Sequence, residues 1–246
     1  MPSAEAVTDH GAVGDGETSE TKALQSAVDA AADAGGGTVH VPSGTYRTGT
    51  VFLRSHVTLD LDAGATLLGS TDRTEYGAGS GPLSGLLVAN DCENVAVVGD
   101  GTIDANGTAF MQMDTPLDPM DDPAIEGADY RPRQESAERF LRTEEVADGP
   151  VAVGDWRPDR TLVCYDAESI RLDGISVRDG PHWTVHFLGC RGVDVQGVDI
   201  RTDPRIPNSD GINPEHTSDV TVSNCTVYTG DDAISPKTNG DYDVGG

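Results

Sequence analysis

The sequence predicts an all-β solenoid, a β-helix, in which short strands and turns coil repeatedly around one axis. A phrase made of a turn residue and an apolar–x–apolar strand recurs at Asn94–Val97, Ser169–Leu172, Gly192–Val195 and Asp219–Val222. In the last three copies the first apolar residues, Ile170, Val193 and Val220, are 23 and 27 residues apart. Each of these units carries a second strand: Gly174–Val177, Gly197–Ile200 and Asn224–Val227. Such a self-similar unit of strands and turns is typical of a β-helix.

The competing fold is an up-and-down barrel or a sandwich. Either would connect strands by hairpins with two-residue turns, and such turns are scarce in this sequence. A chain of 246 residues fits one solenoid, which we expect to form a single domain over residues 1–246.

The N-terminal residues 5–37 are expected to cap the first coil. Residues 5–16 indicate a short strand and a glycine-rich turn, and a helix is predicted from Ser19 to Ala34. Thr18 or Ser19 can cap this helix, Glu20 suits its first turn, and the glycines at 35–37 end it. Its apolar residues recur at helical spacing: Leu24, Ala27, Val28, Ala31 and Ala32.

Short strands are expected to follow the helix. The early ones are Thr38–Val41, Thr50–Leu53, Val57–Leu61 and Ala65–Leu68. Residues 108–160 do not fit the repeat and are rich in Asp, Pro, Glu and Arg. We interpret them as an insertion that leaves the coil, either as a cleft wall or as a mobile flap.

The charge balance restricts the partners. The chain has 42 acidic and 16 basic residues, a net charge of −26. Such a chain repels nucleic acid and anionic membranes, so neither is expected as a partner. Its patterned apolar segments argue against disorder. A folded, acidic protein with two lysines predicts a halophilic, salt-rich working environment, where charge repulsion is screened.

Targeting signals are not evident. The N-terminus has no basic and apolar regions of a signal peptide, and no apolar run approaches membrane-spanning length. The localisation is therefore left open. A monomer is expected.

The four cysteines are widely spaced and form no C-x-x-C pair, so zinc is not expected. Cys92 and Cys190 each precede a valine by three residues, which suggests equivalent buried places in the repeat. A disulfide stays open. No cluster of His, Cys and Asp has metal-ligand spacing, so no metal or cofactor is predicted.

Three carboxylates form the candidate site. Asp210 lies in the turn Asn208–Gly211, and Asp231 and Asp232 lie in a turn 21 residues later. If the chain coils with a similar period, the turns stack at the rung spacing of about 4.8 Å. Carboxylates that close cannot all ionise freely, so at least one pKa should be raised. That property suits acid–base cleavage of a glycosidic bond.

The sequence resembles family 28 of the glycoside hydrolases, the polygalacturonase family. The phrases Asn-Ser-Asp-Gly at 208–211 and Gly-Asp-Asp at 230–232 are similar to the family's catalytic signatures, although serine replaces the usual threonine at 209. Residues 181–186, the opening 11–16 with the helix, and residues 64–70 add to the resemblance. It implies a right-handed parallel β-helix, of the type shared by pectin lyases, that hydrolyses pectic polysaccharide with inversion.

The resemblance also implies roles. Asp231 would be the general acid, while Asp210 and Asp232 would hold and deprotonate the attacking water. Asn208 would order its turn beside the substrate. Two family motifs, a Gly-His-Gly and an Arg-x-Lys that binds substrate carboxylate, do not occur before Gly246. The chain is therefore expected to be an N-terminal portion that is weakly active or inactive alone.

Further substrate contacts are expected from three residues. Lys237, one of the two lysines, could pair with a uronate carboxylate or be a plain surface lysine. His186 lies 24 residues before Asp210 and could face the cleft or be a structural histidine. Trp183 could stack on a sugar ring or fill the core. His182 and His216 are predicted to be turn or surface residues.

Two other functions stay open. A polysaccharide lyase on the same solenoid would use Ca²⁺ and an Arg or Lys base, with the three aspartates as calcium ligands. A non-catalytic solenoid would bind glycans or serve in surface adhesion.

Overall fold

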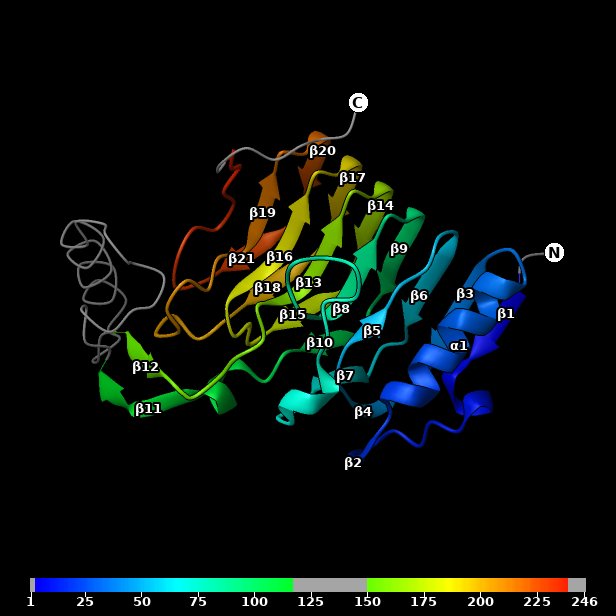
Figure 1. The fold of residues 1–246 in the computed structure, drawn as a ribbon, viewed down its shortest axis with the longest axis horizontal. Coiled ribbons are helices and arrows are strands. Elements are labelled where there is room, and N and C mark those ends of the chain that lie inside the picture. The colour runs from blue at the N-terminus through cyan, green and yellow to red at the C-terminus, as the bar shows by residue number, and fades with distance from the viewer. Residues whose placement is uncertain (1–2, 117–149, 239–246) are drawn as a thin grey trace.

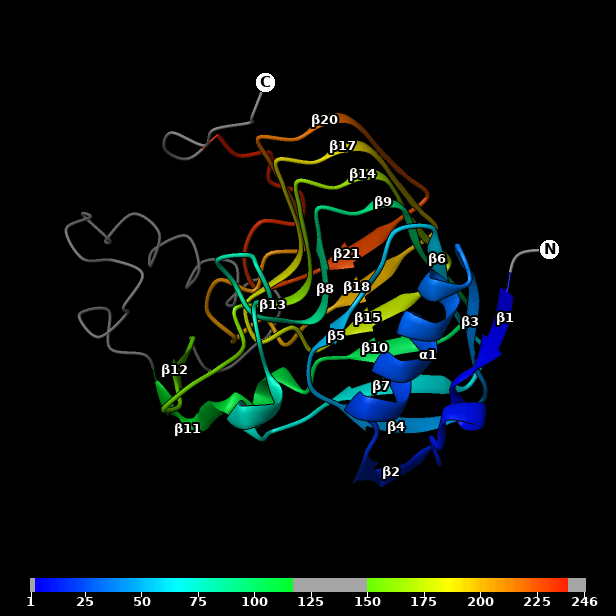
Figure 2. The ribbon, with the colours of Figure 1, turned by 45° about the vertical axis from the view of Figure 1, so that its right-hand side comes forward.

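The computed structural model describes residues 3–116 and 150–238 and confirms the predicted parallel β-helix (Figure 1). Three parallel sheets form its sides, and each complete turn of the coil adds one strand to each sheet, whereas the first and last turns add strands to two of them only. Figure 2 shows the resulting prism, with the coils stacked from the blue N-terminal end to the red C-terminal end.

The two strands that the sequence identified in the C-terminal units belong to two seven-stranded sheets. The first sheet contains β1 (Ser3–Ala6), β3 (Gly37–Val41), β6 (Val57–Leu61), β9 (Glu93–Gly99), β14 (Glu168–Asp173), β17 (Arg191–Gln196) and β20 (Ser218–Ser223). The second contains β2 (Asp15–Ser19), β4 (Gly44–Thr48), β7 (Ala65–Gly69), β10 (Thr102–Asp104), β15 (Ser176–Arg178), β18 (Asp199–Arg201) and β21 (Thr226–Tyr228). The register pairs Ile170 with Val193 and Val193 with Val220, as the repeat spacing requires.

A third, five-stranded sheet completes the coil, and only its first strand was among the predicted ones. Its strands are β5 (Val51–Phe52), β8 (Gly85–Asn90), β13 (Arg160–Tyr165), β16 (Trp183–Leu188) and β19 (Ile212–Glu215). The candidate site lies along this sheet.

Left-handed residues mark the corners of the coil. Asn94, Ser169, Gly192 and Asp219 occupy equivalent positions, and all four have a φ between 55° and 69°. Asn, Asp and Gly tolerate this conformation best, which explains why turn residues precede each strand of the repeat. Asn94 also bonds to His56 of the preceding coil at 3.2 Å, as expected for a ladder of side chains along the stack.

One apolar core runs along the inside of the prism from the helix to β20. Alternate side chains fill it: in β6, Val57, Leu59 and Leu61 are buried while Thr58 and Asp60 are partly exposed. Cys92, Cys164 and Cys190 are buried, and Cys225 is partly buried. All four are free thiols, and burial raises the pKa of Cys190 to about 12.

The helix α1 (Thr21–Asp33) packs its stripe of Leu24, Ala27, Val28 and Ala31 against the first coils (Figure 2). The predicted capping by Thr18 or Ser19 is wrong, because both belong to β2. Glu20 is the N-cap, and its carboxylate accepts hydrogen bonds from the backbone N–H groups of Val13 and Gly14 instead of capping the helix. Three short 3₁₀ helices complete the elements: η1 (Val7–His10), η2 (Arg73–Glu75) and η3 (Gly107–Phe110).

The base of the predicted insertion is an antiparallel ribbon. It consists of β11 (Met111–Pro116) and β12 (Val151–Val153), and Trp156 beyond it packs edge-on against Tyr76 and Phe110. The predicted cleft wall or flap falls largely on residues 117–149, which lie outside the described residues. The last predicted residue of the insertion, Arg160, instead begins β13.

The corner glycines make one prediction about stability. At Gly99 the φ is +110° and an added Cβ would lie 2.2 Å from the Leu61 carbonyl oxygen, whereas at Gly197 the φ is +63° and the nearest atom is 3.8 Å away. Gly197→Ala should lower the free energy of unfolding by about 1–2 kcal/mol, the cost of a left-handed alanine. Gly99→Ala should lower the free energy of unfolding clearly more, because the backbone must also shift to make room for the added Cβ. Urea unfolding of both variants checks this, and equal losses would contradict it.

Candidate active site

The two aspartate turns stack on each other, as the sequence predicted. The N–H of Gly211 donates to the Asp232 carbonyl oxygen at 2.9 Å, and that of Gly230 donates to Ser209 Oγ at 3.1 Å. The bridge between Ile212 and Ile234 continues the third sheet by one rung. Asp210 therefore ends the turn before β19, and Asp231 and Asp232 occupy the corresponding turn one rung further.

Asp210 is a buried carboxylate. Its side chain is 2% exposed, and Lys237 Nζ donates to its Oδ2 at 2.6 Å. Burial is the main reason why its pKa is raised to about 6; Asp231 and Asp232 add to the rise, and Lys237 opposes it. The expectation of a raised pKa is confirmed, but its principal cause is desolvation rather than repulsion between carboxylates.

Asp231 and Asp232 lie in a different environment, since both are exposed. Asp231 Oδ1 accepts a hydrogen bond from the backbone N–H of Asp232 at 3.0 Å. Asp232 Oδ2 accepts one from Ser235 Oγ at 2.8 Å. The cluster thus combines one desolvated carboxylate with two that face solvent, an arrangement that separates the chemical roles available to them.

Two cations approach the ring of Trp183, Arg160 from the neighbouring strand β13 and Lys237 from the rung beyond β19. Lys237 Nζ is 3.6 Å and the Arg160 guanidinium carbon 4.3 Å from the centre of its ring. Both distances are within the range of cation–π attraction. The predicted stacking of a sugar on this ring would require one of the two cations to move.

His186 lies underneath Trp183 with ring centres 5.0 Å apart, and its side chain is 1% exposed. Its Nδ1 accepts from Arg160 Nε at 3.0 Å, so its Nε2 carries the proton and donates to Glu215 Oε2 at 2.9 Å. Burial, helped by Arg160 and Lys237, lowers its pKa to about 3. A neutral ring that is 1% exposed and has both nitrogens bonded agrees with the structural alternative for His186.

Asn208, predicted to order the first turn, adopts a left-handed φ of 56°. Asparagine tolerates this conformation better than most residues, which agrees with that part of its expected role. Its Oδ1 is buried and has no hydrogen-bond partner among residues 3–116 and 150–238.

Sequence reasoning missed Arg160, Glu215 and His182. Arg160 is 8% exposed, and burial lowers its pKa to about 10, so it remains charged at neutral pH. His182 was expected in a turn or at the surface, yet its Nδ1 accepts from the backbone N–H of Trp183 at 2.8 Å and lies 3.1 Å from Arg160. The available signal was the short apolar run at 162–165, which marks β13 as a fully buried strand; its register then pairs Arg160 with Trp183.

No grouping of three or more His, Cys, Asp or Glu that could hold a metal occurs within the described part of the chain. No described helix is long and apolar enough to cross a membrane.

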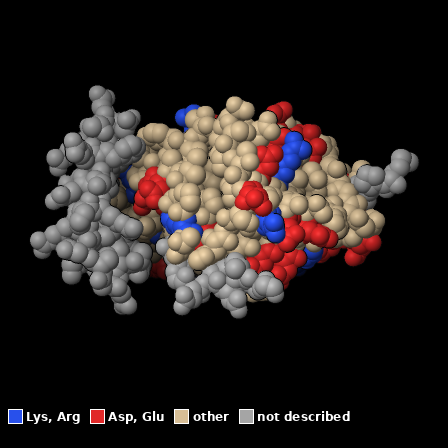
Figure 3. Space-filling model, turned by 90° about the horizontal axis from the view of Figure 1, so that it is seen from above, with Lys and Arg blue, Asp and Glu red and all other residues tan. Residues whose placement is uncertain are grey.

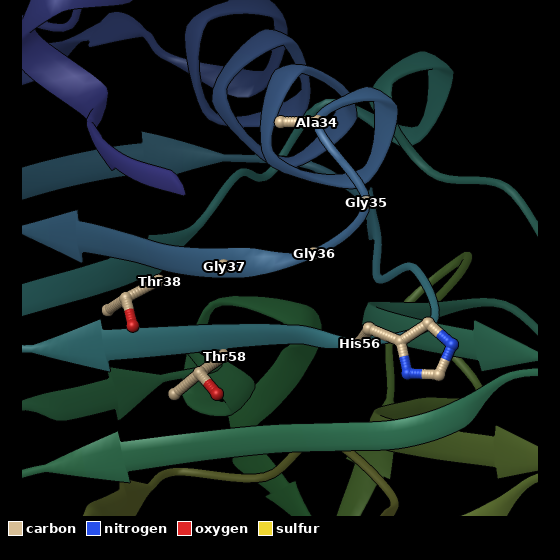
Figure 4. Close-up of a pocket in the computed structure, with 7 residues that line it drawn as sticks. All are labelled: Ala34, Gly35, Gly36, Gly37, Thr38, His56 and Thr58. Carbon is tan, nitrogen blue, oxygen red and sulfur yellow. The ribbon is translucent and has the colours of Figure 1, made fainter. Parts of the chain in front are cut away.

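The face in Figure 3 carries several separate groups of acidic side chains with Lys and Arg among them. A hollow beside the end of α1, lined by residues 34–38 with His56 and Thr58 (Figure 4), contains no carboxylate and is remote from the site.

Comparison with known proteins places the site in a family context. Residues 152–241 match the model of "Glycosyl hydrolases family 28", and residues 5–74 match "Rhamnogalacturonase A/epimerase, pectate lyase-like". A probable polygalacturonase of Vitis vinifera is 29% identical over 252 residues, covering 96% of this chain and 44% of the relative. The chain thus spans less than half of that relative's length.

Solved structures agree. The family 28 exopolygalacturonase of Yersinia enterocolitica superposes with a TM-score of 0.73 and 26% identity, covering 99% of this chain and 46% of the other. The plasmin and fibronectin-binding protein A of Streptococcus pneumoniae is 52% identical over 64 residues, which is 25% of this chain and 9% of that protein. The chain is therefore a relative of the glycosyl hydrolases of family 28, and the resemblance seen in the sequence is confirmed.

Proposed function

We propose that the protein is a glycoside hydrolase that cleaves α-linked, galacturonic-acid-containing pectic polysaccharide with inversion of configuration. The observation that carries this proposal is the stacking of the Asp210 turn on the Asp231–Asp232 turn, within the segment 152–241 that matches family 28. The polygalacturonase relatives support pectic substrates.

In this mechanism Asp231 is the general acid. It gives its proton to the glycosidic oxygen as the bond from that oxygen to the anomeric carbon breaks. Asp210 and Asp232 hold a water on the opposite face of the sugar, take one of its protons, and direct its oxygen to the anomeric carbon. The raised pKa of Asp210 supports its part, because a base is most effective when its pKa lies near the working pH.

Electrostatics oppose the binding of a polyanion to a protein with a net charge of −26. Two features support binding despite this. Lys237 and Arg160 bring local positive charge to the site. A salt-rich environment, which we propose from composition, would reduce the long-range repulsion to within a few ångströms. Activity on polygalacturonate should therefore rise as salt is added from a low concentration.

The test of the reaction type is product analysis. Incubation of the full-length gene product with polygalacturonate should give saturated reducing ends whose first-formed anomer is inverted, as seen by proton NMR. Chelation should leave the rate unchanged. Unsaturated products that disappear on chelation would instead show a lyase, and retention would contradict the single displacement.

A second candidate is adhesion without catalysis, favoured by the similarity to the S. pneumoniae binding protein over 64 residues. It predicts polysaccharide binding that survives Asp231→Asn, with no bond cleavage even by the full-length gene product.

A further inference from the structure

Lys237 has two neighbours that a substrate would disturb. Its Nζ donates to Asp210 Oδ2 at 2.6 Å and lies 3.6 Å from the centre of the Trp183 ring. Its side chain is 16% exposed, whereas that of Asp210 is 2% exposed. The lysine side chain is thus the part of this buried pair that solvent, and a ligand arriving from solvent, can reach.

The charges around the pair make it sensitive to an arriving anion. Asp210 faces Lys237, Asp231 and Asp232, and Arg160 also acts on it from β13. Lys237 in turn faces His182 and His186, which burial keeps neutral. Among these groups, Lys237 is the one that donates a side-chain hydrogen bond to Asp210.

The geometry points to Lys237 as a positioning residue that couples recognition of a uronate carboxylate to the basicity of Asp210. In the free protein, Lys237 neutralises Asp210. When a galacturonate unit binds, its carboxylate draws the ammonium group away, and Asp210 loses the donor that stabilised its charged form. It then accepts the proton of the attacking water more readily. A neutral sugar would leave the pair intact. This inference rests on the proposed function and adds a substrate-dependent switch to it.

The coupling requires proton uptake when an acidic sugar binds. Calorimetry of the purified protein with D-galacturonate, in buffers of different ionisation enthalpy, should show uptake of part of one proton per ligand. The uptake should be largest somewhat above pH 6, midway between the pKa of Asp210 in the free protein and its higher value in the complex. The methyl ester of galacturonate has the same ring but no charge, and it should bind without uptake.

The variant Lys237→Met tests whether the proton uptake depends on the lysine or results from direct repulsion between the carboxylates of galacturonate and Asp210. The variant should lose the uptake, or lose galacturonate binding while it still binds the methyl ester, which also reports an intact fold. Lys237→Arg should retain the uptake at least in part. Equal uptake in the wild type and Lys237→Met would overturn the inference, because the anion would then act on Asp210 without the lysine.

The same experiment distinguishes the two proposals. Hydrolysis of polygalacturonate by a wild-type protein that shows no linked proton uptake overturns the coupling and leaves the proposed function standing. Binding with proton uptake, together with no hydrolysis by the full-length gene product, contradicts the proposed function and retains Lys237 as the residue that senses a carboxylate.

Discussion

Replacing Asp231 with asparagine in the full-length gene product is expected to lower kcat on polygalacturonate by about 10³-fold, within the range for loss of a general acid. Asparagine keeps the size of the side chain and can still accept the hydrogen bond from the backbone N–H of Asp232. It cannot donate a proton to a departing glycosidic oxygen. KM should change little, since the exposed side chain is needed mainly in the transition state.

Substrates with different leaving groups test whether Asp231 is the general acid. An aryl galacturonide with an acidic phenol leaves without protonation, so Asp231→Asn should recover most of its activity on that substrate. Asp232→Asn, which affects the attacking water, should remain slow on both substrates. Asp91→Asn is the matched control; this exposed corner residue with φ 49° tolerates asparagine and should keep full activity. Equal losses on both substrates for Asp231→Asn would remove it from the role of acid.

The coil could be predicted from sequence because its cause is local and periodic. A left-handed turn residue followed by alternating apolar side chains specifies a corner and a strand, and the same pattern recurs at Ile170, Val193 and Val220. The stacking of the two aspartate turns follows from that period. The position of Asp210 could therefore be inferred without any long-range information.

The remainder of the site depends on contacts that sequence spacing does not encode. The strands of the third sheet lack the recurring phrase; β16 (Trp183–Leu188), for example, buries side chains on both faces, so it shows no alternation. Arg160 could not be assigned to a strand from the sequence, because it follows a segment that does not fit the repeat. The depth of His186 could not be predicted either, since its two ring nitrogens bond to Arg160 and Glu215 from the strands on either side.

Asp210→Asn is expected to change the pH dependence of stability as well as activity. The pKa of Asp210 is about 6 in the folded protein, against an ordinary value of 3.8. A carboxyl group whose folded pKa is raised stabilises the fold fully below pH 3.8, and this contribution is lost as the pH rises through 6. The expected loss is about 3 kcal/mol, because a tenfold difference in proton affinity between the folded and unfolded states corresponds to about 1.4 kcal/mol.

The asparagine variant lacks this titration, so its stability relative to the wild type should rise with pH. Near pH 4 the two proteins should be similar, because a protonated carboxyl and an amide are close in size and polarity. By pH 7 the difference in unfolding free energy should have moved by about 3 kcal/mol in favour of the variant, while kcat falls by about 10³-fold. Because the two proteins share all their other titratable groups, the contributions of those groups to the pH dependence cancel in the difference. A difference that stays constant from pH 4 to 7 would mean that Asp210 ionises as freely in the folded chain as in the unfolded one, and that burial does not prepare it as a base.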